Sequence, residues 1–499
     1  MIADELQRLI LTCLHHAPTA DQQRAVGAFC RFMTDGRQNL RHAFILRGSA
    51  GTGKTTLAAA IVSALLQLKQ KLVLLAPTGR AAKVFALNAE HPAYTIHRRI
   101  YRQRTAADMA SPFCLNDNLH ADTLFIVDEA SMIAAGDTAY TSSPASPAVS
   151  FGSGSLLYDL VHYVYSGTRC RLMLIGDSAQ LPPVGEPFSP ALSADALSAF
   201  GLSVVEASLS EVLRQAQASG ILYNATRLRT HLMATATAAD SPLCCHQMAS
   251  LPKIDTAFTD VTIVPGDELI ETLASSYSHA GPDDTIVITR SNKRANVYNQ
   301  GIRRTILDRE DELCRGDQLM IVKNNYHWTQ QDKQTAQAIP FLANGDRCVV
   351  QRVRNQRTMH GFRFADVTLL FPDYDDHELT ATVILDTLAT DAPALTHEQQ
   401  QQLYDRVMAD YADIPLKAER IRQVRKDPFY NALQVKFGYA VTCHKAQGGQ
   451  WEHVYIDQGY MTDDMANDDY LHWLYTAFTR ATTHLFLVNW PKAQTSTGE

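Results

Sequence analysis

One segment constrains the fold of this chain more than any other: residues 44–57, which read FILRGSAGTGKTTL. The pattern GxxxxGK[ST] runs from Gly48 to Thr55, after a short apolar run and before a helical pattern. Glycines at this spacing let backbone N–H groups close around phosphates, in a loop between a buried strand and a helix. The segment therefore predicts an α/β fold with a parallel sheet and a phosphate-binding loop.

The side chains of this loop have distinct predicted roles. Lys54 is expected to reach the β and γ phosphates of a nucleotide, and Thr55 to offer its hydroxyl to a magnesium ion. The expected nucleotide-binding residues are Gly48, Ser49, Ala50, Gly51, Thr52, Gly53, Lys54, Thr55 and Thr56. The pattern thus predicts ATP and Mg²⁺ as cofactors.

Two later apolar runs end in polar residues that suit hydrolysis. TLFIVDEAS at 123–131 ends in Asp128, expected to hold Mg²⁺ through water, and Glu129, expected to orient the attacking water. RLMLIGDSAQLPP at 171–183 brings Gln180 to a strand end, where an amide could sense the γ-phosphate. A solvated strand end is the alternative interpretation of the Asp-Glu pair.

Two segments between these runs suggest a second, extended phosphate ligand. LVLLAPTGRAA at 72–82 reads as a strand ending in Thr78 with a helix starting after it, and a helix N-terminus is an anion site. YTIHRRIYRQR at 94–104 interleaves arginines with Tyr101, as a nucleic-acid contact or a small hairpin would. A solvated charged helix face explains the second segment equally well.

Length and amino-acid composition limit the number of domains and the class of protein. A length of 499 residues suggests roughly three domains, with 46% hydrophobic and 19% charged residues, as in globular proteins. The net charge of -7 argues against whole-surface basicity, although a groove can still be basic. Nine cysteines without a CxxC pair predict a reduced, cytoplasmic protein, and the longest apolar run, at 58–68, is too short to cross a membrane.

Other clusters carry weaker chemistry. Cys244, Cys245 and His246 are adjacent, so they cannot all turn to one tetrahedral metal, and we interpret them as ordinary thiols rather than a zinc site. Acidic runs at 373–376, 463–464 and 468–469 could suggest a nuclease, but surface acids are the favoured interpretation.

The motif blocks resemble, in their order along the chain, those of superfamily 1 helicases, specifically the RecD and Dda branch. The blocks are GSAGTGKTT, LAPTGRAA, TIHR, VDEAS, GDSAQLPPVG, VTCHKAQGGQW and YTAFTRA. The resemblance implies two RecA-like domains with ATP in the cleft between them and single-stranded DNA bound across both. It also implies movement from 5′ to 3′, and tailed duplex DNA as a substrate.

The resemblance assigns further residues by motif position. Gln22 would read adenine, and Arg214 and Arg480 would reach the γ-phosphate from the second domain, although Arg214 could be only a helix-surface charge. A second group would touch DNA, and each of its threonines and asparagines could instead cap a helix. That group comprises Thr78, His97, Thr289, Asn292, Thr442 and His444.

The expected partition has four parts. The first RecA-like motor domain takes residues 1–97 and 122–215, interrupted at 98–121 by a short pin-type hairpin. The second motor domain takes residues 216–310 and 432–499. Residues 311–431 form an inserted Src-homology-3-like β-barrel plus a helical region at 396–428, which either braces the first domain or is a solvated face.

The chain departs from the resemblance in two places. A Ser/Pro/Ala/Gly stretch at 136–155 reads as a flexible insertion beside the catalytic carboxylates, either regulatory or a plain solvated loop. Only about forty residues precede the phosphate loop. We therefore expect a stand-alone, monomeric helicase, with protein partners unidentified.

VTCHKAQGG at 441–449 leaves a choice of chemistry. Cys443 beside His444 could be a nucleophile with its base, but no acyl-substrate pocket accompanies them in the sequence. We interpret Thr442 and His444 as DNA-facing, Cys443 as core, and residues 445–449 as a coupling turn. An RNA helicase and a nucleotide-switched binding module remain as alternative functions.

Overall fold

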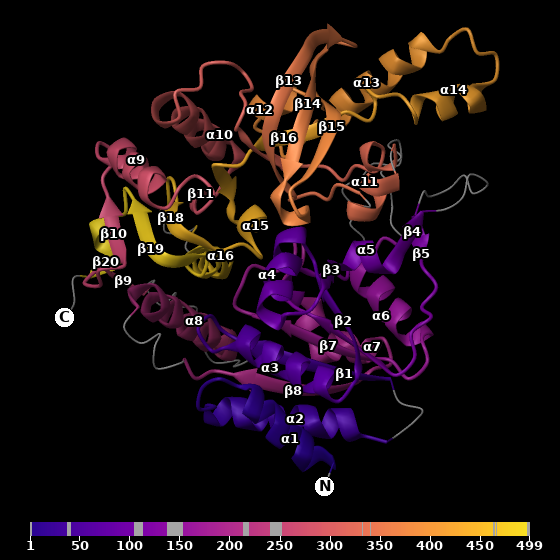
Figure 1. Cartoon of the computed structure of the whole chain (residues 1–499). Coiled ribbons are helices and arrows are strands. Elements are labelled where there is room, and N and C mark those ends of the chain that lie inside the picture. The colour runs from indigo at the N-terminus through magenta and orange to yellow at the C-terminus, as the bar shows by residue number, and fades with distance from the viewer. Residues whose placement is uncertain are drawn as a thin grey trace.

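The computed structural model describes residues 2–36, 41–103, 113–136, 153–212, 219–239, 252–331, 333–339, 341–462, 465 and 467–496. These residues form two parallel sheets flanked by helices and a closed β-barrel (Figure 1). The predicted fold class, α/β with a small barrel insertion, is confirmed.

The first sheet holds six strands in the order β3-β2-β6-β7-β1-β8, all parallel. Its central strands are almost continuous apolar runs, as expected where helices bury both faces of a sheet. The strands are β1 (His42–Gly48), β2 (Lys71–Ala76), β3 (Ala93–Thr95), β6 (Thr123–Val127), β7 (Arg171–Gly176) and β8 (Ser203–Leu209).

Helices cover both faces of this sheet and form two separate cores. One face packs against α1 (Ile2–Cys13), α2 (Ala20–Thr34), α3 (Lys54–Gln67) and α4 (Gly79–Ala89). The other packs against α5 (Ile96–Ile100), η1 (Ala130–Met132), α6 (Leu156–Ser166), η3 (Pro190–Leu192) and α7 (Ala194–Ala199). Strands β4 (Tyr101–Gln103) and β5 (Phe113–Leu115) pair antiparallel within the segment predicted as a pin hairpin, whose tip lies outside the described residues.

The second sheet is also parallel, in the order β10-β19-β18-β11-β17. Helices α8 (Gly220–Ala239) and α16 (Asp468–Phe478) pack on one face, and α9 (Leu269–His279) and α10 (Asn292–Gly301) on the other. The strands are β10 (Val261–Val264), β11 (Thr285–Thr289), β17 (Ala440–Thr442), β18 (Trp451–Asp457) and β19 (Ala481–Val488). The smaller elements are η5 (Ile302–Ile306), α15 (Cys443–Ala446), η9 (Lys492–Gln494) and the paired strands β9 (Ile254–Asp255) and β20 (Thr495–Ser496).

The barrel closes in the order β12-β13-β14-β15-β16. Its strands are β12 (Gln318–Ile321), β13 (Arg347–Met359), β14 (Phe362–Phe371), β15 (His377–Ile384) and β16 (Leu433–Phe437). The predicted domain boundary at residue 431 is wrong, because β16 belongs to the barrel and not to the second motor domain. The run LQVKFGYAVT reads as one strand, but it bends at Gly438, so its first half pairs with β12 and β15.

Short helices decorate the barrel, and two longer ones extend it. The short elements are η6 (Trp328–Gln330), α11 (Lys333–Ala338), η7 (Pro372–Tyr374) and α12 (Asp386–Ala389). Helices α13 (His397–Asp410) and α14 (Lys417–Val424) share a small core with β14, at the end of the barrel far from the first sheet (Figure 1). The region at 396–428 therefore does not brace the first domain.

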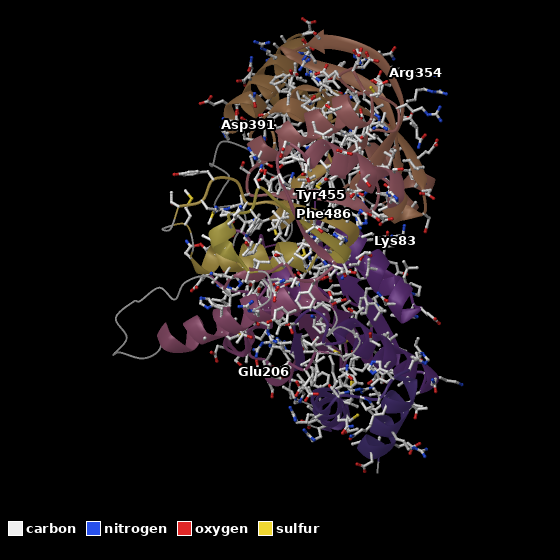
Figure 2. The ribbon with its side chains drawn as sticks, turned by 90° about the vertical axis from the view of Figure 1, so that its left-hand side faces the viewer. Lys83, Glu206, Arg354, Asp391, Tyr455 and Phe486 are labelled. Carbon is white, nitrogen blue, oxygen red and sulfur yellow. The ribbon has the colours of Figure 1, made fainter. Side chains whose placement is uncertain are left out.

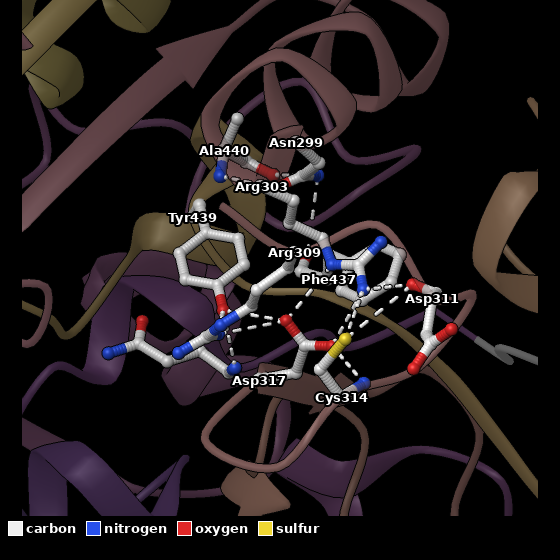
Figure 3. A network of polar contacts seen from close by, with 10 residues as sticks. Asn299, Arg303, Arg309, Asp311, Cys314, Asp317, Phe437, Tyr439 and Ala440 are labelled. Atoms are coloured by element: carbon white, nitrogen blue, oxygen red, sulfur yellow. Dashed lines mark hydrogen bonds and ion pairs between the residues drawn. The ribbon is translucent and has the colours of Figure 1, made fainter. Parts of the chain in front are cut away.

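A buried ionic cluster joins the barrel to the second sheet (Figure 3). Arg303 of η5, only 2% exposed, donates to both carboxylate oxygens of Asp317 at 2.9 and 3.0 Å. Arg309 and Tyr439 also donate to Asp317, at 2.9 and 3.0 Å. The carboxylate is thus fully paired, the condition under which a buried charge is tolerated.

Aromatic rings fill the second sheet near this join. Tyr455 of β18 and Phe486 of β19 stack with ring centroids 4.3 Å apart, and Figure 2 places them just below the barrel. Among the described helices, none has the length and apolar character needed to cross a bilayer.

Candidate nucleotide and nucleic-acid sites

The phosphate loop joins β1 to α3, as its sequence predicted. Gly53 caps α3 with φ of 77°, a left-handed conformation that favours glycine. A Cβ on Gly48 would lie 2.8 Å from Lys54 Cγ and 2.9 Å from Thr52 Oγ1, so only glycine fits this close turn. Lys54 Nζ donates to the Ser49 carbonyl at 2.9 Å, which holds the ammonium over the loop.

Gln22 lies beside the loop in the capping box that begins α2. Its side-chain oxygen accepts from Thr19 N at 3.1 Å, and its Nε2 donates to the Thr52 carbonyl at 3.2 Å. The residue is fully buried, so its amide connects the helix start to the phosphate loop. Its adenine-reading role stays a prediction.

The carboxylate pair sits at the end of β6, next to the loop. Burial, together with the neighbouring Glu129, raises the pKa of Asp128 to about 7. The backbone N–H of Glu129 donates to Asp128 Oδ1 at 2.9 Å, and Glu129 itself takes a positive φ of 51°. A bound cation would reverse the effect of burial on Asp128, so the pair fits a magnesium site better than a surface role.

The end of β7 adds an unsatisfied group. Gln180 is 5% exposed, and its Oε1 accepts no hydrogen bond from any described residue. A buried amide oxygen without a partner is unfavourable unless a ligand or water meets it. This observation fits the predicted contact with the γ-phosphate or its attacking water.

Of the two arginines predicted to reach the γ-phosphate, only Arg480 lies within the described residues. Arg480 is 3% exposed and donates to the carbonyls of Thr476 and Gly449, at 3.0 and 3.1 Å. It therefore ties α16 to the turn of the VTCHKAQGG segment. Arg214 lies outside the described residues.

The predicted DNA-facing residues of the first sheet region have different surroundings. Thr78 caps α4 by accepting from Ala81 N at 3.2 Å, as the strand-to-helix reading expected. His97 is partly buried, with its ring 6.0 Å from that of Phe341, and burial lowers its pKa to about 4. A neutral imidazole at this place offers stacking rather than charge.

In the second sheet region, Asn292 and Thr442 come together. They line one small pocket with Lys436 and Lys445, at the point where α10 meets β16. The Lys445 ammonium has no hydrogen-bond partner in the described part of the chain, and burial, with Lys436 beside it, lowers its pKa to about 8. Lys436 also donates to the Thr390 carbonyl, so Lys445 is the cation of this pocket that an anion could pair with.

The other residues predicted in the second sheet region, Thr289, His444 and Cys443, have different surroundings. Thr289 is buried, and its hydroxyl donates to the Ser291 carbonyl at 3.0 Å, so it acts within the loop. His444 is exposed. Cys443 is fully buried, its Sγ faces the Trp473 carbonyl at 3.5 Å, and burial raises its pKa to about 12, so it is core and not a nucleophile.

Contacts between the first and second sheet regions, here called the motor seam, combine hydrogen bonds with the packing of Ala179 and Leu181 into the apolar core of the second sheet. Gln447 Nε2 donates to the Leu181 carbonyl at 2.7 Å, and Leu181 N donates to Thr476 Oγ1 at 2.7 Å. The Arg80 guanidinium lies 4.2 Å from the centroid of a Trp451 ring. The end of β7 is thereby held by α16 and by the VTCHKAQGG segment together.

Two residues at this seam were missed by the sequence analysis. The Tyr475 hydroxyl accepts from Ala50 N of the phosphate loop at 3.1 Å and donates to Asp177 at 2.5 Å. Arg229 of α8 donates to Ser49 Oγ at 3.0 Å. Tyr475 is the first residue of the block YTAFTRA, but no role was assigned to it, and Arg229 lies in no motif.

Two parts of the chain match known protein families. Residues 19–148 match an AAA domain family, and residues 437–488 match the UvrD-like helicase C-terminal domain family. The first match contains the phosphate loop and the carboxylate pair, and the second contains VTCHKAQGG, Tyr475 and Arg480. The second match is to a helicase domain family, in keeping with the predicted resemblance to superfamily 1 helicases, and we call the chain the helicase from here on. The helicase is accordingly an ATP-hydrolysing enzyme, as predicted.

Solved structures add a distant likeness. The Pif1 helicase from Bacteroides in complex with ADP-AlF3 and ssDNA shares 14% identity with a TM-score of 0.45, covering 97% of this chain and 95% of that one. Pif1 helicase from Candida albicans shares 15% identity with a TM-score of 0.38, covering 97% of each chain. At these values the likeness assigns no residue role. No curated protein sequence matches the helicase.

Proposed function

We propose that the helicase binds single-stranded DNA across both sheet regions and moves along it from 5′ to 3′, separating tailed duplex DNA as it hydrolyses ATP. The observation that carries the DNA assignment is the pocket of Asn292, Thr442, Lys436 and Lys445. Its unpaired ammonium suits a backbone phosphate, because a charge-assisted contact would satisfy it. The polarity rests on the resemblance to the RecD and Dda branch.

The proposed division of labour follows the sheets. The first motor domain contains the phosphate loop and the carboxylates, and the second contains the DNA pocket. The barrel packs against the second motor domain and moves with it. Thr55 and Asp128 are proposed to hold Mg²⁺, which neutralises phosphate charge when it is bound. Thr78, His97 and His444 are the further proposed DNA contacts, and the molecule is proposed to act as a monomer.

Movement requires that DNA affinity depend on nucleotide state. The motor seam supplies a route, because Gln447 of the VTCHKAQGG segment holds the carbonyl of Leu181, one residue after Gln180. A shift of the β7 end on hydrolysis would move the segment that carries Thr442 and His444.

ATP turnover measured with and without single-stranded DNA tests the proposal. We expect a large stimulation by DNA, abolished in Glu129→Gln, and a smaller one by RNA of the same sequence. Equal turnover with and without DNA would contradict the translocase, and stronger stimulation by RNA would favour an RNA helicase. Unwinding of a duplex with a 5′ tail, but not of one with a 3′ tail, tests the polarity separately.

The VTCHKAQGG segment offers an internal comparison. His444→Ala should weaken DNA-stimulated turnover, since the exposed ring lies beside the proposed DNA contact Thr442. Cys443→Ala, which alters the adjacent buried side chain, is the matched control and should weaken that stimulation less. The reverse order would mean that the segment acts through its core packing rather than through DNA.

A further inference from the structure

Helix α8 crosses the motor seam and lies against the phosphate loop. A Cβ on Gly51 would come within 3.2 Å of Leu222, and Arg229 donates to Ser49 Oγ at 3.0 Å. These two side chains are seven positions apart, so they lie on one face of the helix, two turns from each other. The face of α8 that carries Arg229 therefore points at the nucleotide-binding loop.

Two cations meet at one loop residue. Lys54 Nζ is hydrogen-bonded to the Ser49 carbonyl and Arg229 Nη1 to the Ser49 hydroxyl. Within the ranges that the structure describes, Arg229 forms no ion pair with a carboxylate. The charge of Lys54 also acts on Asp128, whereas Arg229 has no carboxylate partner among the described residues, so an anion bound between the two cations at Ser49 would stabilise them.

The position of Arg229 indicates which part of the nucleotide it faces. Its charge acts on Tyr475, whose hydroxyl joins Ala50 N to Asp177 at the end of β7. That strand end also carries Gln180, with its unpartnered buried amide oxygen. Arg229 thus lies on the side of the loop where the γ-phosphate is expected, and not on the adenine side at Gln22.

We propose that Arg229 contacts the γ-phosphate of ATP from the second motor domain, moving from the Ser49 hydroxyl to a phosphate oxygen when ATP binds. The contact rests on the ATP-hydrolysing function and adds a residue outside the helicase motifs. Because α8 belongs to the second sheet region, the contact would draw the motor seam closed in the ATP state and release it after hydrolysis.

The test compares Arg229→Gln with Arg227→Gln, a matched loss of charge two residues away. The Arg227 guanidinium packs 5.7 Å from the Tyr223 ring, with no hydrogen bond to the loop among the described residues. Affinity for a β,γ-imido analogue of ATP and for ADP is measured by calorimetry, with Mg²⁺ present. Arg229→Gln should weaken the analogue about 10- to 150-fold, the range for one hydrogen bond to a charged group.

The expected signature is selectivity for the triphosphate. Binding of ADP should change by less than about threefold, kcat should fall, and Arg229→Lys should recover part of the analogue affinity. Equal losses for both nucleotides, or no loss relative to Arg227→Gln, would overturn the inference, and thermal unfolding of each variant identifies a folding defect. The binding comparison needs no turnover, so it separates this inference from the proposed translocation.

Discussion

The helicase contains two joins that differ in how much apolar core they share. At the motor seam, Ala179 and Leu181 are the residues of the first sheet region that enter the core of the second sheet, beside separate polar contacts such as Tyr475 to the phosphate loop and Gln447 to Leu181. The barrel join combines the buried Arg303–Asp317 pair with a hydrophobic core shared by the second sheet and the barrel. That core runs without a break from Val287 of β11 to Val367 of β14.

The difference in packing between the two joins indicates which parts of the molecule can move relative to one another. Hydrogen bonds at an interface exchange with water at a small net free energy, about 1 kcal/mol each, so a seam held by such bonds and by only a small apolar contact can open and close. A shared core with a paired buried charge is stable only when intact. We infer that the barrel and the second sheet move as one unit, and that the motor seam is the hinge.

The largest expected effect comes from breaking the barrel join. Asp317→Ala leaves the buried Arg303 guanidinium without its partner and should lower the free energy of unfolding by about 3–5 kcal/mol. Urea unfolding followed by fluorescence measures this loss. Asp122→Ala, which breaks an exposed pair with Arg169, is the control and should change stability by less than about 1 kcal/mol. Similar losses in both variants would mean that the buried pair of the barrel join contributes no more than an exposed ion pair.

A smaller effect is expected at the motor seam. Tyr475→Phe removes the hydroxyl between Ala50 N and Asp177, which leaves the part-buried Ala50 N–H and Oδ2 of the buried Asp177 without this partner, so the free energy of unfolding should fall by about 1–3 kcal/mol. Scanning calorimetry would detect the change. Tyr223→Phe, at a ring 43% exposed, should stay near the wild type. If the loss in free energy of unfolding is as large as that of Asp317→Ala, the motor seam contributes as much to stability as the barrel join.

The smallest expected effect concerns pH and the DNA pocket. Burial and Lys436 hold the pKa of Lys445 near 8, so its ammonium form is present at pH 7 and is lost as pH rises through 8. Affinity for single-stranded DNA should fall about tenfold from pH 7 to pH 9, and Lys445→Arg should abolish most of that fall.

Fluorescence anisotropy at the two pH values measures this affinity. Because the pocket lies at the barrel join, the midpoint should be the same with and without ADP. A midpoint that shifts with the nucleotide would place the pocket on the moving side, and an unchanged affinity at pH 9 would remove Lys445 from the DNA site.

Much of the fold was predictable, because its signals are local. The loop at 48–55, the carboxylates after β6 and the alternating strands of the barrel all lie within short windows with a fixed period. The boundary at β16 failed for a physical reason. A bend at Gly438 separates two strands that read as one, and only the pairing partner decides which sheet each half joins.

The contacts at the two joins could not be predicted. Arg227 and Arg229 are close neighbours on one helix, and no periodicity says which of them meets the phosphate loop. Asp317 lies in a polar stretch, CRGDQ, that resembles any surface turn, although its side chain is fully buried. Arg229 and Ser49 are 180 positions apart and Asp317 and Tyr439 are 122 positions apart, and a single sequence does not pair residues at such separations.

The bend at Gly438 also has a mechanical consequence. Within the twelve residues 433–444 the chain passes from barrel strand β16 through sheet strand β17 into Cys443 and His444. Gly438 N donates to the Gln318 carbonyl at 2.9 Å, so the backbone between the two strands is anchored to β12. A force on the barrel would reach Gln447 through this backbone, and would reach the end of β7 through the hydrogen bond from Gln447 to the Leu181 carbonyl.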